Sequence, residues 1–212
     1  MTDVDERTEQ ARSLQTKAKL LAATLSTIHD VGWASASSAR IADAAGVSRG
    51  AQTHHYPTKT DLLIAAMEEA NRRQDERVRK GLTNLVDAED PVEAYLRLIW
   101  DTLRDPSYSA SWIEAVVAAR TDHDLRTTVA RIDAHIFELI GDATATLAHR
   151  AGDADPERTA DLVRLAVYAM RGMVLERPIR GTEAERERLL ETLIETITRE
   201  RSATSSVGPD QR

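Results

Sequence analysis

Apolar residues recur every three or four positions along this chain, and this spacing constrains its fold more than any other feature. The first clear run consists of Leu14, Ala18, Leu21, Leu25 and Ile28. Residues with this spacing lie on one face of an α-helix, which has about 3.6 residues per turn. No stretch alternates convincingly between apolar and polar residues, as a half-buried β-strand does. The sequence therefore predicts an all-α protein.

Capping residues and helix breakers delimit three helices near the amino terminus. The first must end near Gly32. A short second helix over residues 37–45 has a predicted buried face of Ile41, Ala44 and Ala45. It ends at Gly46, because glycine best tolerates the left-handed conformation that follows a helix. Ser48 is a natural N-cap for a third helix of about two turns, which Pro57 terminates.

The same signals predict helices over the rest of the chain. Thr58 and Asp61 form a capping box that restarts the helical pattern. Asp90-Pro91 and Asp155-Pro156 each place a proline in a first helical turn, where its missing N–H does no harm. Pro106 breaks one helix. Further helices are expected around Trp112 and over residues 124–150, 155–175 and 183–201.

Composition excludes several classes of protein. The chain has no cysteine, so disulfides and thiolate chemistry are ruled out. Its amino terminus, MTDVDERTEQ, is acidic, whereas a secretory signal has a basic end followed by an apolar run. No stretch approaches the roughly 18 consecutive apolar residues that a transmembrane helix requires. We therefore expect a soluble, cytoplasmic protein without a membrane partner.

The distribution of charge separates the two parts of the chain. The net charge of −7 by itself argues against a nucleic-acid partner, because phosphates attract Lys and Arg. Residues 7–60, however, carry seven basic and three acidic side chains, whereas residues 61–212 carry 21 basic and 29 acidic ones. This asymmetry predicts an amino-terminal part that can approach an anion and an acidic remainder that would be repelled by it.

Residues 37–57 have the pattern of a helix-turn-helix, whose second helix enters the major groove of DNA. Gly46 turns the chain, and Val47 fills the space between the two helices. Side chains of the second helix and of the turn after it offer hydrogen-bond donors to base edges and phosphates: Arg49, Gln52, Thr53, His54 and Lys59. The pattern thus predicts a DNA-binding surface.

Residues 14–67 resemble the amino-terminal domain of the tetracycline-repressor (TetR) family of bacterial transcription regulators. The resemblance rests on LLAA in the first helix, the Gly32-Trp33 turn, IADAAGVSRGA, HHYPTK and the DLL that opens the fourth helix. It implies an all-helical homodimer with a divergent carboxy-terminal ligand-binding domain. The helices expected downstream agree with this implication.

The resemblance also implies which residues contact DNA. It places in the groove Ser48, Arg49, Gly50, Gln52 and Thr53, and it places against the phosphate backbone His54, Lys59, Ser37, Ser38 and Arg40. The chain departs from the family pattern at Thr53, where a tyrosine that reaches a phosphate is common, and at Gln52, where an apolar residue is common. Gln52 is therefore a candidate for additional base readout.

Metal binding and catalysis find no support in the sequence. Adjacent helical residues point about 100° apart, so His54 and His55 do not converge on one metal. We expect His54 to face outward and His55 to pack inward beside Tyr56. The cluster Asp122-His123-Asp124 lies at a helix junction, where acids serve as caps. No catalytic motif is present, so we expect neither an enzyme nor a cofactor.

The aromatic residues of the carboxy-terminal part have two interpretations. Trp100, Trp112 and Phe137 either fill the core or line an apolar ligand pocket between helices. In the second case the polar anchors would be drawn from Glu114, Arg120, His123 and His135.

The last two helices are candidates for a dimer interface. The penultimate helix is apolar nearly all round, so it must be buried on more than one side. We expect both helices to pack against their symmetry mates in a four-helix interface. The predicted interface residues are Leu162, Ala166, Met170, Met173, Leu189, Leu190, Leu193 and Ile197.

The sequence thus predicts a flexible amino terminus (1–9), a three-helix DNA-binding domain (10–57), a helical ligand-binding and dimerisation domain (58–201) and a disordered tail (202–212). The expected function is ligand-responsive, sequence-specific DNA binding, most often repression in this family, relieved from a palindromic operator by a small molecule. The alternative is a helical small-molecule-binding or interaction protein that has lost operator recognition.

Overall fold

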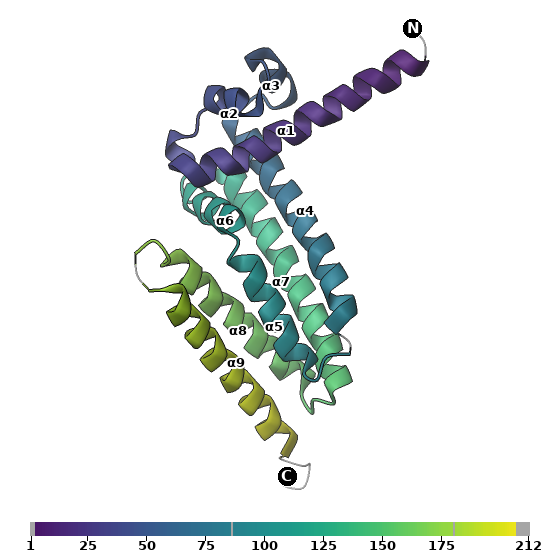
Figure 1. Ribbon diagram of the computed structural model, residues 1–212, viewed down its shortest axis with the longest axis vertical. Coiled ribbons are helices and arrows are strands. Elements are labelled where there is room, and N and C mark those ends of the chain that lie inside the picture. Colours follow the sequence, from purple (N-terminus) through teal and green to yellow (C-terminus); the bar gives the residue numbers. More distant parts are fainter. Residues whose placement is uncertain (1–2, 86, 180, 207–212) are drawn as a thin grey trace. The chain divides into compact units, whose positions relative to one another are not determined.

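The computed structural model describes residues 3–85, 87–179 and 181–206 (Figure 1). Over these residues the chain forms nine α-helices and no strand, which confirms the predicted all-α class. The helices are α1 (Asp3–Ser35), α2 (Ser38–Ala45), α3 (Arg49–His55), α4 (Lys59–Leu85), α5 (Pro91–Leu103), α6 (Pro106–Ala118), α7 (His123–Ala151), α8 (Pro156–Leu175) and α9 (Glu183–Ser206). None of the described helices is long and apolar enough to cross a membrane.

The chain divides into two compact units. The first, called here the amino-terminal unit, comprises the residues up to Arg73 together with Pro106–Arg131. The second, the carboxy-terminal unit, comprises Gln74–Asp105 and the residues from Ile132 onward. A single boundary after residue 57 was predicted, whereas the structure groups α6 with the helix-turn-helix. The reason is that α6 packs directly against α1.

The predicted capping residues begin the helices as expected. The Ser37 and Ser48 side chains accept backbone N–H groups at the starts of α2 and α3. Thr58 and Asp61 form the reciprocal capping box, with N···O distances of 2.9 and 3.0 Å. Asp90 and Asp155 cap α5 and α8, each of which has a proline in its first turn. These boundaries follow from local sequence because each cap satisfies a donor within three residues.

The two ends of the chain are more helical than predicted. α1 begins at Asp3, inside the segment predicted to be flexible, and α9 continues to Ser206, inside the predicted tail. The early part of α1 is rich in Glu, Arg, Gln and Ala, which favour a helix even where nothing covers it. The remaining residues of these two predicted segments, 1–2 and 207–212, lie outside the described part of the chain.

A small core holds the helix-turn-helix together. Its centre consists of Leu20 and Ala23 of α1, Ile41 of α2 and Leu62 of α4, and packed against this centre are Leu21, Ala45, Val47 and Tyr56. Val47 fills the space between α2 and α3, as predicted. Ala44 is exposed, contrary to the prediction, and Ala42 is buried instead.

The carboxy-terminal unit contains a buried ionic cluster, called here the Arg201 cluster and consisting of Arg201, Asp90 and Asp153. The Arg201 side chain is only 7% exposed and donates to both carboxylates, with N···O distances of 2.9 Å. Asp90 also caps α5, and Asp153 also accepts the Thr159 hydroxyl. The cluster therefore ties the end of α9 to the start of α5 and to the α7–α8 turn.

Candidate nucleic-acid interface

The turn between α2 and α3 is set by Gly46. Its φ of 65° and ψ of 35° are left-handed, a conformation that glycine adopts without strain. The Val47 N–H then donates to the Ala42 carbonyl at 3.0 Å, which closes the end of α2. Ser48 starts α3 at once by accepting the Ala51 N–H at 3.1 Å. This compact turn holds α3 beside α1 and α2 (Figure 1).

One face of α3 is polar and open to solvent. Arg49, Gly50, Thr53 and His54 are all exposed and lie within about 140° of arc on the helix. The Thr53 hydroxyl bonds back to the Arg49 carbonyl at 3.0 Å and remains on the surface. A Cβ added to Gly50 would meet nothing within 4 Å, so no neighbour in the chain requires glycine there. The face has the donors and the free space that a DNA groove needs.

The two histidines end α3 in different surroundings, as predicted. His54 is exposed, whereas His55 is partly buried with its ring 6.5 Å from that of Tyr56. Burial lowers the pKa of His55, and electrostatic interactions with His54 and Lys17 lower it further. Lys17, an exposed lysine of α1, thus acts electrostatically on a residue at the end of α3. Lys17 was not among the residues predicted to contact DNA, although it lies one turn before Leu21, which packs on this same core.

Gln52 corrects the prediction of a groove contact. It is 1% exposed, and its Nε2 donates to the Tyr56 carbonyl at 2.6 Å. Its position on α3 is the one that faces the core, where the family pattern favours an apolar side chain. The amide is hydrogen-bonded there because the carbonyl of Tyr56, the C-cap residue of α3, accepts its N–H. Gln52 therefore stabilises the end of α3 and is not available to read bases.

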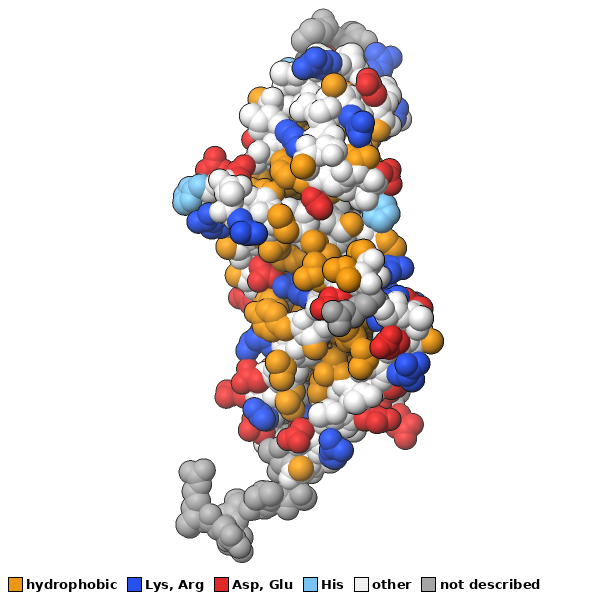
Figure 2. All heavy atoms as spheres, turned by 90° about the vertical axis from the view of Figure 1, so that its left-hand side faces the viewer, with side chains coloured by type: hydrophobic (Ala, Val, Ile, Leu, Met, Phe, Trp, Pro, Cys, Tyr) orange, Lys and Arg blue, Asp and Glu red, His pale blue; other side chains and the backbone are white. Residues whose placement is uncertain are grey.

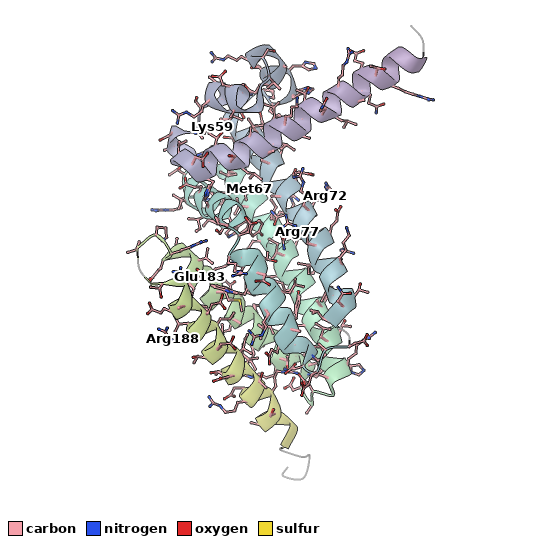
Figure 3. The ribbon with its side chains drawn as sticks, viewed as in Figure 1. Lys59, Met67, Arg72, Arg77, Glu183 and Arg188 are labelled. Carbon is pink, nitrogen blue, oxygen red and sulfur yellow. The ribbon has the colours of Figure 1, made fainter. Side chains whose placement is uncertain are left out.

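Lys59 has a partner inside the amino-terminal unit. Its ammonium group lies 3.8 Å from the centre of the Trp33 ring and donates to the Trp33 carbonyl, beside the end of α1 (Figure 3). Burial lowers the pKa of Lys59, and the nearby carboxylate of Glu114 opposes that shift. An ammonium group has three donors, so this contact leaves the predicted phosphate contact of the partly buried Lys59 a prediction.

The predicted contacts at the start of α2 are placed as follows. Ser37 is exposed, but its hydroxyl oxygen accepts the Arg40 N–H at 3.2 Å as the N-cap. Ser38 is partly buried. Arg40 is exposed and extends the basic character of the surface. Of these three residues, Arg40 has the side chain that is most available to donate to a phosphate, because it is charged and exposed.

The residues predicted for a ligand pocket have separate environments. In the carboxy-terminal unit, Trp100 is 2% exposed and its indole N–H donates to Glu187 at 3.3 Å. His135 faces Asp75 at 3.4 Å, and Phe137 stacks on Tyr168 with ring centres 5.0 Å apart. In the amino-terminal unit, Glu114 accepts the Trp33 N–H, Trp112 is partly buried, and exposed positions are taken by Arg120 and His123.

A cavity of about 440 Å³ lies elsewhere, next to the Arg201 cluster. None of the seven predicted pocket residues lines it. For Trp100 the core-filling interpretation is favoured, because this residue of α5 is buried and its indole N–H donates to Glu187 of α9.

The predicted dimer residues fall into two groups. Ala166, Met170, Leu190 and Ile197 are at most 3% exposed within the single chain, so they have almost no surface to offer a partner. Leu162, Met173 and Leu193 are partly buried, and Leu189 is 50% exposed. The exposed face of α8 instead carries Leu165, Tyr168 and Leu175, at 64, 56 and 53%. Figure 2 shows hydrophobic side chains between charged ones in the lower part of the surface, where α8 and α9 lie.

Asp122, one of the groups considered for catalysis, has a structural role. Asp122 accepts the Leu125 N–H at 3.0 Å and so caps α7, as predicted. Among the residues that the structure describes, no group of three or more His, Cys, Asp or Glu side chains is arranged to hold a metal ion.

Comparison with known proteins assigns the chain to a family. Residues 20–66 match the model of the bacterial regulatory proteins, tetR family. The chain is 32% identical over 198 residues to the HTH-type transcriptional regulator CymR of Pseudomonas putida, covering 93% of this chain and 96% of that protein.

Two solved structures share the fold. One is a TetR-family member from Streptomyces coelicolor, with a TM-score of 0.63, 26% identity and coverage of 87% of this chain and 96% of that one. The other is the multidrug binding protein EbrR complexed with malachite green, with a TM-score of 0.58, 24% identity and coverage of 86 and 96%. The chain is therefore a transcriptional regulator of the TetR family, and not an enzyme.

Proposed function

We propose that the protein is a homodimeric, ligand-responsive repressor that binds a palindromic operator through α3 and is released by a small molecule. The observation that carries this proposal is the exposed polar face of α3, formed by Arg49, Gly50, Thr53 and His54. This face is the part of a helix-turn-helix that enters the major groove. Gln52, which is buried, is no longer part of the proposed contact.

Gly50 gives independent support for a partner at this face. Glycine within a helix costs about 0.5–1 kcal/mol relative to alanine, and here no neighbouring atom requires it. The open space above Gly50 allows the backbone of α3 to approach another molecule closely. Arg49 on one side can then reach a base edge or a phosphate oxygen.

The proposed dimer uses the exposed apolar face of α8 and α9. Leu165, Tyr168, Leu175 and Leu189 are each at least half exposed in the single chain. A second copy related by a two-fold axis would cover the same residues on both chains. Such a dimer presents two α3 helices to half-sites roughly 34 Å apart, which is about one turn of DNA.

The proposed effector is a small organic molecule, by analogy with the malachite green complex of EbrR. To change the DNA-binding population from 1:99 to 99:1, it must favour the released state by about 10⁴-fold. The acidic carboxy-terminal part, which carries 29 acidic and 21 basic residues from position 61 onward, would stay away from the phosphates.

Replacing Arg49 by Ala is expected to weaken operator binding by about 30-fold to 10⁴-fold, because one charged contact to a base or phosphate is worth about 1–3 kcal/mol and the dimer loses one such contact at each half-site. The side chain is exposed at the start of α3, so the substitution should leave the melting temperature nearly unchanged. The measurement is fluorescence anisotropy with DNA from the promoter of the protein's own gene, in a series of salt concentrations.

A matched control is Arg150→Ala, an exposed arginine at the end of α7 in the carboxy-terminal unit. This variant should bind the operator as the wild type does, and its salt dependence should be unchanged. Equal affinity of the Arg49→Ala protein and the wild type would show that α3 is not the DNA-reading surface. Absence of any DNA binding by the wild type would favour the alternative of a regulator-like protein without an operator.

A further inference from the structure

The break in helical geometry at Gly32 removes the Trp33 N–H from the hydrogen-bond pattern of α1. Gly32 has a φ of 73° and a ψ of 163° inside α1, and the helix resumes for only a few residues. The Trp33 N–H therefore has no helical carbonyl in line with it. Only glycine adopts this conformation readily, so the break is fixed by sequence.

A carboxylate from a distant part of the chain accepts this donor. Oε2 of Glu114, on α6, lies 2.7 Å from the Trp33 nitrogen, although the two residues are 81 positions apart. The same carboxylate lies over Gly32, with its oxygens 3.6 and 3.7 Å from the position that a Cβ would take. A hydrogen bond from an N–H to a charged oxygen is roughly twice as strong as a neutral one.

Lys59, at the start of α4, also contacts Trp33. Its ammonium group donates to the Trp33 carbonyl and lies over the Trp33 ring. Trp33 precedes α2, and Lys59 follows α3 by four residues. The residues before and after the helix-turn-helix, Trp33 and Lys59, are therefore in contact. We call Trp33, Lys59 and Glu114 the Trp33 junction.

A second contact reinforces the junction. The Thr60 hydroxyl, next along α4, donates to Oδ2 of Asp122 at 3.2 Å. Asp122 in turn caps α7 through its other oxygen, 3.0 Å from the Leu125 nitrogen. The start of α4 is thus bound both to Trp33, whose N–H Glu114 accepts, and to Asp122 before α7, all within the amino-terminal unit.

We propose that Glu114 is a positioning residue for DNA recognition, which fixes the base of the helix-turn-helix by accepting the Trp33 N–H. It lies outside the stretch 20–66 that matches the family model, and it does not contact the exposed face of α3. Its role rests on the proposed function, because the helix that it positions is the proposed DNA-reading helix. Without Glu114, the Trp33 junction loses its only acidic member, and α3 samples orientations that do not fit the groove.

Because Glu114 is negatively charged, its role in positioning can be distinguished from its long-range electrostatic effect on DNA affinity. Removing an acidic side chain makes the protein less negative, and this change alone would strengthen attraction to phosphates. A positioning role predicts the opposite result. The apparent affinity falls with the fraction of molecules in the competent orientation.

The test compares Glu114→Ala with Glu114→Gln, whose amide oxygen can still accept the Trp33 N–H. Glu114→Ala is expected to weaken specific binding by about tenfold or more, the factor that corresponds to one charge-assisted hydrogen bond. Binding to unrelated DNA should stay the same or rise slightly. Glu114→Gln should restore specific binding to within about threefold of the wild type. The readouts are anisotropy with specific and unrelated duplexes, measured well below the melting temperature of each variant.

Amide hydrogen exchange of the free protein gives a readout that does not depend on DNA. The Trp33 N–H should exchange faster in Glu114→Ala and at nearly the wild-type rate in Glu114→Gln. Glu138→Ala, which removes an exposed acid from α7, is the charge-matched control; it should leave the exchange rate of the Trp33 N–H unchanged and leave DNA binding the same or slightly stronger.

Two results would overturn the inference. One is an unchanged exchange rate of the Trp33 N–H in Glu114→Ala. The other is an unchanged ratio of specific to unrelated binding, with only the melting temperature lowered, as a purely structural role predicts. A wild-type protein that binds no DNA would instead contradict the proposed function, and the exchange measurement would still decide whether Glu114 holds Trp33.

Discussion

Arg201→Met is expected to lower the free energy of unfolding by about 3 kcal/mol, because it leaves two partly buried carboxylates without their counter-charge. The Arg201 side chain is 7% exposed, and its partners Asp153 and Asp90 are 10 and 25% exposed. Methionine fills a similar space to the arginine side chain, so the loss of stability reflects the missing charge more than a change of volume. The measurement is urea unfolding at a fixed protomer concentration, since the stability of a dimer depends on concentration.

The pH dependence of this effect follows from Asp153. Its burial alone would raise its pKa, but hydrogen bonds from Arg201 and Thr159 outweigh burial, and the pKa lies below the usual value. A carboxyl group whose pKa is lower in the folded state stabilises the protein above its unfolded pKa of about 4. That contribution is lost as the pH falls through the folded value. The difference between wild type and Arg201→Met should therefore be full at neutral pH and shrink in acid.

Arg199→Met is the matched control for this prediction. Arg199 lies two residues earlier on α9 and is exposed. A surface charge of this kind contributes at most about 1 kcal/mol. Equal losses of stability in the two variants would show that the Arg201 cluster does not hold the end of α9 in place.

Leu165→Glu is expected to raise the dissociation constant of the dimer by about 10³-fold or more. A two-fold interface carries each substitution twice, and a charge at the centre of an apolar interface costs about 2–3 kcal/mol per copy. Leu165 is 64% exposed in the single chain, so the fold of each protomer should be unaffected. Sedimentation equilibrium measures the dimer, and circular dichroism checks the helix content.

Operator binding should fall together with the dimer. A monomer presents one α3 helix and can contact only one half-site. The control is Val117→Glu, which places the same charge on α6 at a position that is 54% exposed. Dimerisation of Leu165→Glu at wild-type strength would show that the two chains meet at another surface.

The local features of this fold could be predicted from the sequence because they depend on neighbours. The caps at Ser37, Ser48 and Asp90 each bind a backbone group within three residues, and Gly46 turns the chain by its own conformational freedom. The exposed face of α3 follows from the same helical period. The family resemblance pointed to the same stretch of the chain.

The features that the sequence could not predict depend on how the helices pack. Gln52 has a polar side chain and was predicted to read bases, yet the core face of α3 accepts it because the Tyr56 carbonyl lies within reach. The Lys59 ammonium group donates to the Trp33 carbonyl, which is 26 residues away. The Glu114 carboxylate accepts the N–H of Trp33, which is 81 residues away. Spacing along the chain contains no information on these two long-range pairs.

The dimer prediction shows a different limit. α8 is apolar on nearly all sides, so periodicity cannot decide which side faces the protomer's own core. Ala166 and Leu165 are adjacent, and their side chains point about 100° apart on the helix. Both are apolar, but Ala166 is 0% exposed and Leu165 is 64% exposed. The structure resolves this ambiguity because α5 and α9 cover one face of α8.

Selection of bound duplexes from a random DNA pool with the wild-type protein tests whether this regulator reads a specific operator through α3. If it does, two inverted half-sites should be enriched, with their centres about one turn of DNA apart. Affinity for the selected sequence should also fall steeply as the salt concentration rises. No enriched sequence, or binding that is insensitive to salt, would show that the protein does not recognise an operator in this way.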